Sequence, residues 1–167
     1  MFAHAIASQA NARMPLLARD HRLASWGRPH PLACRTILVV EYRDEVAARL
    51  VADLTATGIH VQRAVCAAEA SRCCASFRAD LLLVNVDLPD GSGWLLTAKL
   101  RLFAQTPHIW LYAASPSPND MAFAEFVGAD GLIDNGGDVW RLSAEVISRL
   151  SVLPTTRILA GTISRCA

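Results

Sequence analysis

The sequence lacks the features that define several common protein classes. No apolar run approaches the roughly 20 residues that a membrane-spanning helix needs, so we expect no membrane segment. There is no G-x-G-x-x-G or G-x-x-x-x-G-K-[S/T] motif, and nucleotide binding therefore has no motif support. Lysine occurs only as Lys99, although the chain carries 16 basic residues. A role that requires a lysine elsewhere is thus excluded.

The five cysteines are odd in number, and no pair of them has the C-x-x-C spacing. We interpret the five cysteines as reduced thiols. The first residues lack the charged start and compact apolar core of a secretory signal, so we expect a cytoplasmic protein. The histidines are scattered and form no ligand or triad spacing. The sequence therefore predicts a protein that is not an enzyme.

The charge balance is close to neutral, with a net charge of +1. A protein that binds nucleic acid usually shows a basic footprint, so we expect no such partner. Arginines near both ends leave one alternative, a DNA-linked transcriptional regulator that lacks its output domain. Nothing after residue 152 is long enough to form a helix-turn-helix domain.

The stretch 81–93 combines an apolar run, a polar residue and a turn, and it is the most informative part of the sequence. Its first residues, Leu81 to Val84, form an unbroken apolar run, which is typical of a strand buried on both faces. The run ends at Asn85, and a turn rich in proline and glycine follows. Ligands of open α/β sheets bind beyond the carboxyl ends of the strands, so Asn85 is expected at the functional rim.

Strand and helix patterns alternate from residue 35 onward. Five strand-then-helix units predict an α/β fold with a doubly wound, five-stranded parallel sheet in the flavodoxin-like order 2-1-3-4-5 and helices on both faces. The predicted strands are 36–40, 59–65, 81–85, 109–113 and 131–134, and the predicted helices are 44–57, 67–77, 94–103, 117–127 and 138–150. We expect a flexible or weakly helical leader over 1–34, a domain over 35–152, and a tail over 153–167.

Several short motifs occur in an order and spacing that resemble the receiver domain of bacterial two-component response regulators. They are Ile37 to Glu41 at the first strand, Gly58-Ile59-His60-Val61, Leu88 to Gly93, Thr106-Pro107, and Gly128-Ala129-Asp130-Gly131. The resemblance covers about residues 35–150. It implies a CheY-like fold and a regulatory role in which an aspartate accepts a phosphoryl group beside Mg²⁺.

The resemblance also shows which positions would carry out phosphoryl transfer, and in this sequence most of those positions hold residues that cannot do so. The phosphoacceptor position is Asn85, whose amide has no anionic oxygen for an acyl phosphate. The acidic pair that holds Mg²⁺ corresponds to Glu41 and Tyr42, so one acid remains. The hydroxyl position after the fourth strand is Tyr112 or Ala113.

The position of the phosphate-binding lysine corresponds to Asn135, and Lys99 lies in another helix. We therefore interpret the chain as a degenerate pseudo-receiver that works without phosphorylation. We expect no cofactor and no Mg²⁺ site. A small-ligand or metal site at the strand rim, with Glu41 and Asp87 as weak metal candidates, remains a second alternative.

A regulator of this kind acts through protein contacts, and we expect a kinase or output protein as the partner. Receivers associate through the face formed by the fourth helix, fifth strand and fifth helix, which makes a homodimer through that face possible. The interface candidates are Met121, Phe123, Phe126 and Trp140. Taken singly, each of these side chains is nevertheless expected to pack in the core.

Overall fold

The chain alternates strands and helices, as the sequence pattern predicts. The computed structural model describes residue 32 and residues 35–103 and 106–153. Almost all of the predicted leader and tail therefore lies outside the described residues. The strands are β1 (Thr36–Val40), β2 (His60–Ala64), β3 (Leu81–Asn85), β4 (Asp87–Leu88), β5 (Gly91–Ser92), β6 (His108–Ala113) and β7 (Gly131–Asp134). The helices are α1 (Asp44–Ala56), α2 (Ala67–Ser76), α3 (Gly93–Leu100), α4 (Pro118–Phe126) and α5 (Val139–Val152).

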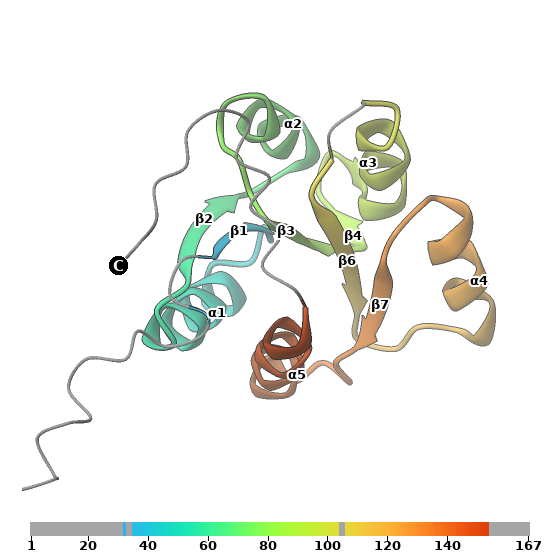
Figure 1. Ribbon diagram of the computed structural model, residues 1–167. Coiled ribbons are helices and arrows are strands. Elements are labelled where there is room, and N and C mark those ends of the chain that lie inside the picture. Colours follow the sequence, from blue (N-terminus) through green and yellow to red (C-terminus); the bar gives the residue numbers. More distant parts are fainter. Residues whose placement is uncertain (1–31, 33–34, 104–105, 154–167) are drawn as a thin grey trace, which may run out of the picture.

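The five long strands form one parallel sheet in the order β2-β1-β3-β6-β7. This order confirms the predicted flavodoxin-like topology, because β6 and β7 are the fourth and fifth strands of the main sheet. Helices α1 and α5 cover one face, while α2, α3 and α4 cover the other (Figure 1). None of the helices in the described segments is long and apolar enough to cross a membrane.

Strand β3 is buried along its whole length because it lies at the centre of the sheet, between β1 and β6. Alternate side chains enter the two cores. Leu81 and Leu83 pack on the α1–α5 side, and Leu82 and Val84 pack on the other side. The continuous apolar run was therefore read correctly, and it brings Asn85 to the carboxyl end of the central strand.

The turn after β3 is more ordered than the sequence predicts. It forms a small antiparallel hairpin of β4 and β5, which pairs Asp87 with Ser92. Gly93 begins α3 directly against β3, and a Cβ atom there would overlap the carbonyl oxygen of Asn85. The glycine is thus required by this close approach, which fixes the hairpin to the end of β3.

The four interface candidates do not pack in the core, so that expectation was wrong. The exposed fractions are 51% for Met121, 45% for Phe123, 83% for Phe126 and 64% for Trp140. Within α4 only Ala124 is buried, because the helix contacts the sheet through one narrow stripe. The larger apolar side chains of α4 remain on its outer surface.

Candidate functional site

Three polar side chains meet where β1, β3 and β6 end. Asn85 lies opposite Tyr112 in the β3–β6 register, and Glu41 follows the last residue of β1. The Glu41 carboxylate is completely buried and accepts two hydrogen bonds across the sheet. Asn85 Nδ2 donates to Glu41 Oε2 at 3.1 Å, and the Tyr112 hydroxyl donates to the same oxygen at 2.6 Å.

The side chain of Arg43, in the loop between β1 and α1, supplies further hydrogen bonds to the Glu41 carboxylate. Arg43 occupies the N-cap position of α1, and its guanidinium donates to both carboxylate oxygens at 3.1 and 2.9 Å. The Arg43 backbone N–H also donates to Glu41 Oε1 at 2.8 Å. Arg63 holds the loop through the carbonyl oxygens of Glu41 and Tyr42. A buried carboxylate is tolerated only when it is paired and hydrogen-bonded, and both conditions are met here.

The protonation states agree with this geometry. Burial raises the pKa of the Glu41 carboxyl, but hydrogen bonds from Arg43 and Tyr112 outweigh it, so the pKa lies below its usual 4.5. Burial, followed by the charge of Glu41, raises the pKa of the Tyr112 phenol far above its ordinary value. The hydrogen bond to Glu41 likewise raises the pKa of Arg43. The network is therefore a carboxylate held by a protonated phenol and a guanidinium at neutral pH.

These residues do not fit a magnesium ion. Mg²⁺ requires oxygen ligands that are free to turn toward it, preferably charged ones. Both oxygens of Glu41 already accept hydrogen bonds, and Asn85 Oδ1 accepts the Asp87 backbone N–H at 3.0 Å. The Asp87 side chain lies exposed on the hairpin. Within the described segments no three His, Cys, Asp or Glu side chains cluster in a way that could hold a metal ion.

The buried polar side chain at the end of β7 is not fully hydrogen-bonded, in contrast to Glu41. Asn135 follows β7 and is only 4% exposed, yet its Oδ1 has no hydrogen-bond partner among the described residues. Its Nδ2 reaches the Asp138 carbonyl oxygen at a long 3.4 Å. Asn135 and Tyr112 line a small cavity of about 50 Å³, together with Arg43, Val46, Asn85, Asp87, Ala114, Gly137 and Val139.

The structure thus brings together Glu41, Asn85 and Tyr112. Of the two candidates on β6, Tyr112 rather than Ala113 supplies a hydroxyl group to the site. Tyr42 stays 44% exposed, and its ring lies against the Arg43 guanidinium. Arg43 was not among the site residues expected from the sequence. A cation two residues after a lone buried acid was the signal that could have identified it.

The comparisons with known proteins agree with this fold. Residues 37–146 match the response regulator receiver domain family. A two-component response regulator from Clostridium difficile is 25% identical, with a TM-score of 0.62, over 70% of this chain and 95% of that one.

A receiver domain of a signal transduction histidine kinase from Syntrophus aciditrophicus is 26% identical, with a TM-score of 0.63, over 78% of this chain and 99% of that one. Chemotaxis response regulator CheY4 of Vibrio cholerae, at 19% identity, shows the same fold with a TM-score of 0.63 over 70% and 98% of the two chains. No curated protein matches the sequence. The match covers well over half of the sequence, and the chain belongs to the response regulator receiver domain family.

Proposed function

We propose that this receiver domain regulates its target through protein contacts and without aspartyl phosphorylation. The observation that carries the proposal is the closed network around Glu41, in which the Arg43 guanidinium supplies the positive charge that a metal ion would otherwise provide. At the phosphoacceptor position, the Asn85 amide donates to that carboxylate instead of presenting a nucleophilic oxygen.

The same network supports binding rather than catalysis. A nucleophile or general base must have a free lone pair directed at its substrate. Glu41 and Asn85 instead direct their polar atoms at neighbouring side chains and backbone groups. We infer that the domain is not an enzyme and uses no Mg²⁺, and that its conformation is set by a partner or a bound ligand.

The exposed side chains of α4 and α5 support a contact-based role. Phe123 packs edge-on against Trp94 of α3 and stacks on Phe126, so an apolar surface extends across α3 and α4. Trp140 stands on α5 beside Arg49, and exposed tryptophan is typical of binding hot spots. We propose a kinase or an output protein as the partner, with a homodimer through α4, β7 and α5 as the second possibility.

We also propose a cytoplasmic location. The described cysteines, Cys66, Cys73 and Cys74, are free thiols, which suits a reducing compartment.

The test of phosphorylation independence uses Mg²⁺ with beryllofluoride and, separately, acetyl phosphate on the full chain. We expect no mass increase and no change in the backbone amide spectrum. The Asn85→Asp variant is the matched control. It restores a carboxylate at the phosphoacceptor position, while Arg43 still forms its ion pair with Glu41. A stoichiometric phospho-adduct on the unmodified chain would overturn the proposal.

The test of the contact surface is the mass of the full chain in solution, measured by light scattering across a concentration series. If α4 mediates a homodimer, Phe126→Ser lowers the dimer fraction, while Glu45→Ser on α1 leaves it unchanged. A monomer at every concentration would remove the homodimer and leave the kinase or output protein as the partner.

A further inference from the structure

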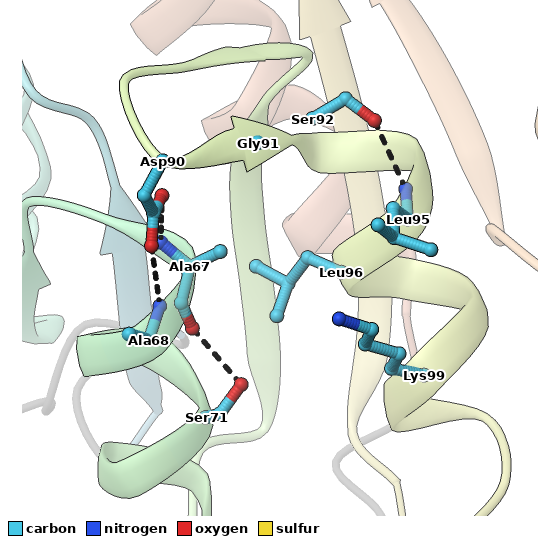
Figure 2. Close-up of a pocket in the computed structure, with 9 residues that line it drawn as sticks. All are labelled: Ala67, Ala68, Ser71, Asp90, Gly91, Ser92, Leu95, Leu96 and Lys99. Carbon is cyan, nitrogen blue, oxygen red and sulfur yellow. Dashed lines mark hydrogen bonds between the residues drawn. The ribbon is translucent and has the colours of Figure 1, made fainter.

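A second pocket lies away from the rim, between α2, α3 and the β4–β5 hairpin (Figure 2). Its volume is about 160 Å³. That volume is close to the roughly 150 Å³ of an apolar cavity that holds one benzene ring, so a ligand of about six heavy atoms fits. The pocket is lined by Ala67, Ala68, Ser71, Asp90, Gly91, Ser92, Leu95, Leu96 and Lys99.

The ammonium group of Lys99 is the distinctive polar feature of this pocket. Figure 2 shows its nitrogen directed from α3 across the pocket toward α2. Within residues 35–103 and 106–153, no carboxylate or carbonyl oxygen pairs with it. The exposed lysine therefore carries an unneutralised charge at the edge of an open pocket.

The opposite side of the pocket is already occupied by a carboxylate. Asp90 accepts hydrogen bonds from the backbone N–H groups of Ala67 and Ala68 at 2.8 and 2.9 Å. From its place in the hairpin turn, Asp90 therefore caps the start of α2. Because Asp90 takes these N–H groups, the end of α2 is not available to an anionic ligand.

We propose that this pocket binds a small monocarboxylate with a short aliphatic stem. Its carboxylate pairs with Lys99, the cation among the described residues that line the pocket, and its stem packs on Leu96 and Ala67. A dianionic phosphate is poorly served, because the site offers no arginine fork and no free cluster of backbone N–H donors. A second acid group on the ligand is repelled by Asp90.

The pocket is connected to the degenerate rim by a short chain of hydrogen bonds. Asp90, Gly91 and Ser92 belong to the hairpin, and the first hairpin residue, Asp87, donates its backbone N–H to Asn85 Oδ1. Asn85 in turn donates to Glu41. A bound carboxylate can therefore shift the hairpin and, through it, the rim. This regulatory role rests on the proposed function, in which an input other than phosphorylation sets the conformation.

The test is a titration of the isotopically labelled full chain with sodium butyrate at constant ionic strength, followed by amide chemical shifts. We expect saturable shifts at Ser71 and Gly91 to Leu96, smaller ones at Asn85 to Asp87, and a dissociation constant of about 1–10 mM. Lys99→Met should weaken binding at least about tenfold, and Lys99→Arg should retain most of it.

Three controls separate a built site from general charge effects. Arg78→Met removes another exposed cation and should change the dissociation constant less than about twofold. Butyramide, which has the same shape without the charge, and succinate, which adds a second acid, should both bind more weakly than butyrate. Shifts that do not saturate, or that persist unchanged in Lys99→Met, would overturn the proposal.

These results are separable from the test of phosphorylation independence. A phospho-adduct at the rim would remove the proposed function but leave butyrate binding intact. Absence of saturable binding would remove this pocket while leaving phosphorylation independence untouched.

Discussion

The two halves of the rim carry equally buried polar residues but satisfy them differently. At the ends of β1, β3 and β6, Glu41 accepts bonds from Arg43, Asn85 and Tyr112. At the end of β7, the equally buried amide of Asn135 keeps one oxygen without a partner in the part of the chain that the structure describes. In the first half the buried acid is paired with a cation, Arg43, whereas the second half contains a neutral amide.

The difference follows from the free energy of burying each group. A buried carboxylate without a counter-charge costs several kcal/mol, so a chain that keeps Glu41 must supply a cation. A neutral amide acceptor without a partner costs only about 1–3 kcal/mol, which a domain of this size can tolerate. The Glu41 half is therefore under structural constraint, and the Asn135 half is comparatively free to vary.

Glu41→Ala is the most direct test of whether the buried carboxylate holds the first half of the rim together. The change removes the shared acceptor and leaves the buried donors of Tyr112 and Asn85 unpaired. We expect the free energy of unfolding to fall by about 4 kcal/mol, since each unpaired donor costs roughly 1–3 kcal/mol. Urea denaturation followed by tryptophan fluorescence measures the loss.

The matched control is Glu45→Ala, because Glu45 is exposed on the first turn of α1. It should change the free energy of unfolding by less than about 0.5 kcal/mol. Equal losses for the two variants would show that Glu41 is not the centre of the network.

Tyr112→Phe removes only one donor and keeps the ring in the core. A hydrogen bond to a charged group contributes about 1.5–3 kcal/mol, so we expect a loss of about 2 kcal/mol. Coupling to Glu41 is measured by the double variant Glu41→Gln with Tyr112→Phe. Strictly additive losses would mean that the hydroxyl and the carboxylate do not interact.

Most of the fold was predictable because each main element has its own local signal. The apolar run 81–84 forms a strand as expected, and the helix expected over 117–127 is α4, with Ser117 at its N-cap and Pro118 as its first residue. The β4–β5 hairpin was missed, since two-residue strands leave no periodicity to detect. The exposure of Phe123 and Phe126 was also missed, because an apolar helix face does not reveal whether a partner or the core covers it.

Only part of the site was predictable from the sequence, namely the part that follows from the order of the strands. The order of the strands implies that Glu41, Asn85 and Tyr112 share one rim, because parallel strands end at the same edge. Arg43 was missed, although its position two residues after a lone buried acid was a usable signal. Asp90 could not be assigned in this way, because its role depends on how the hairpin folds back onto α2, and sequence spacing does not fix that geometry.

Acid should weaken the Glu41 half selectively. The pKa of Glu41 in the folded chain lies below its usual 4.5, although burial acts to raise it, because bonds from Arg43 and Tyr112 prevail. The stabilisation is present above the unfolded pKa and is lost as pH falls through the lower, folded pKa. We expect Glu41→Gln to flatten the decline in stability below about pH 4.5, measured by thermal unfolding from neutral to acidic pH. An unchanged slope in Glu41→Gln would mean that other carboxyl groups cause the decline.

The smallest expected effect comes from comparing Asn85→Ala with Asn135→Ala. The two variants are well matched, since both side chains are 4% exposed and have the same size. Asn85 makes two side-chain hydrogen bonds within 3.1 Å, so its removal should cost about 2 kcal/mol. Asn135 loses only one long contact and an oxygen that was already unpaired, so we expect a loss below about 1 kcal/mol. Chemical denaturation of the two variants side by side measures the difference. If Asn135→Ala proved the more costly change, the β7 half would hold a partner for that oxygen, and the two halves of the rim would be under the same constraint.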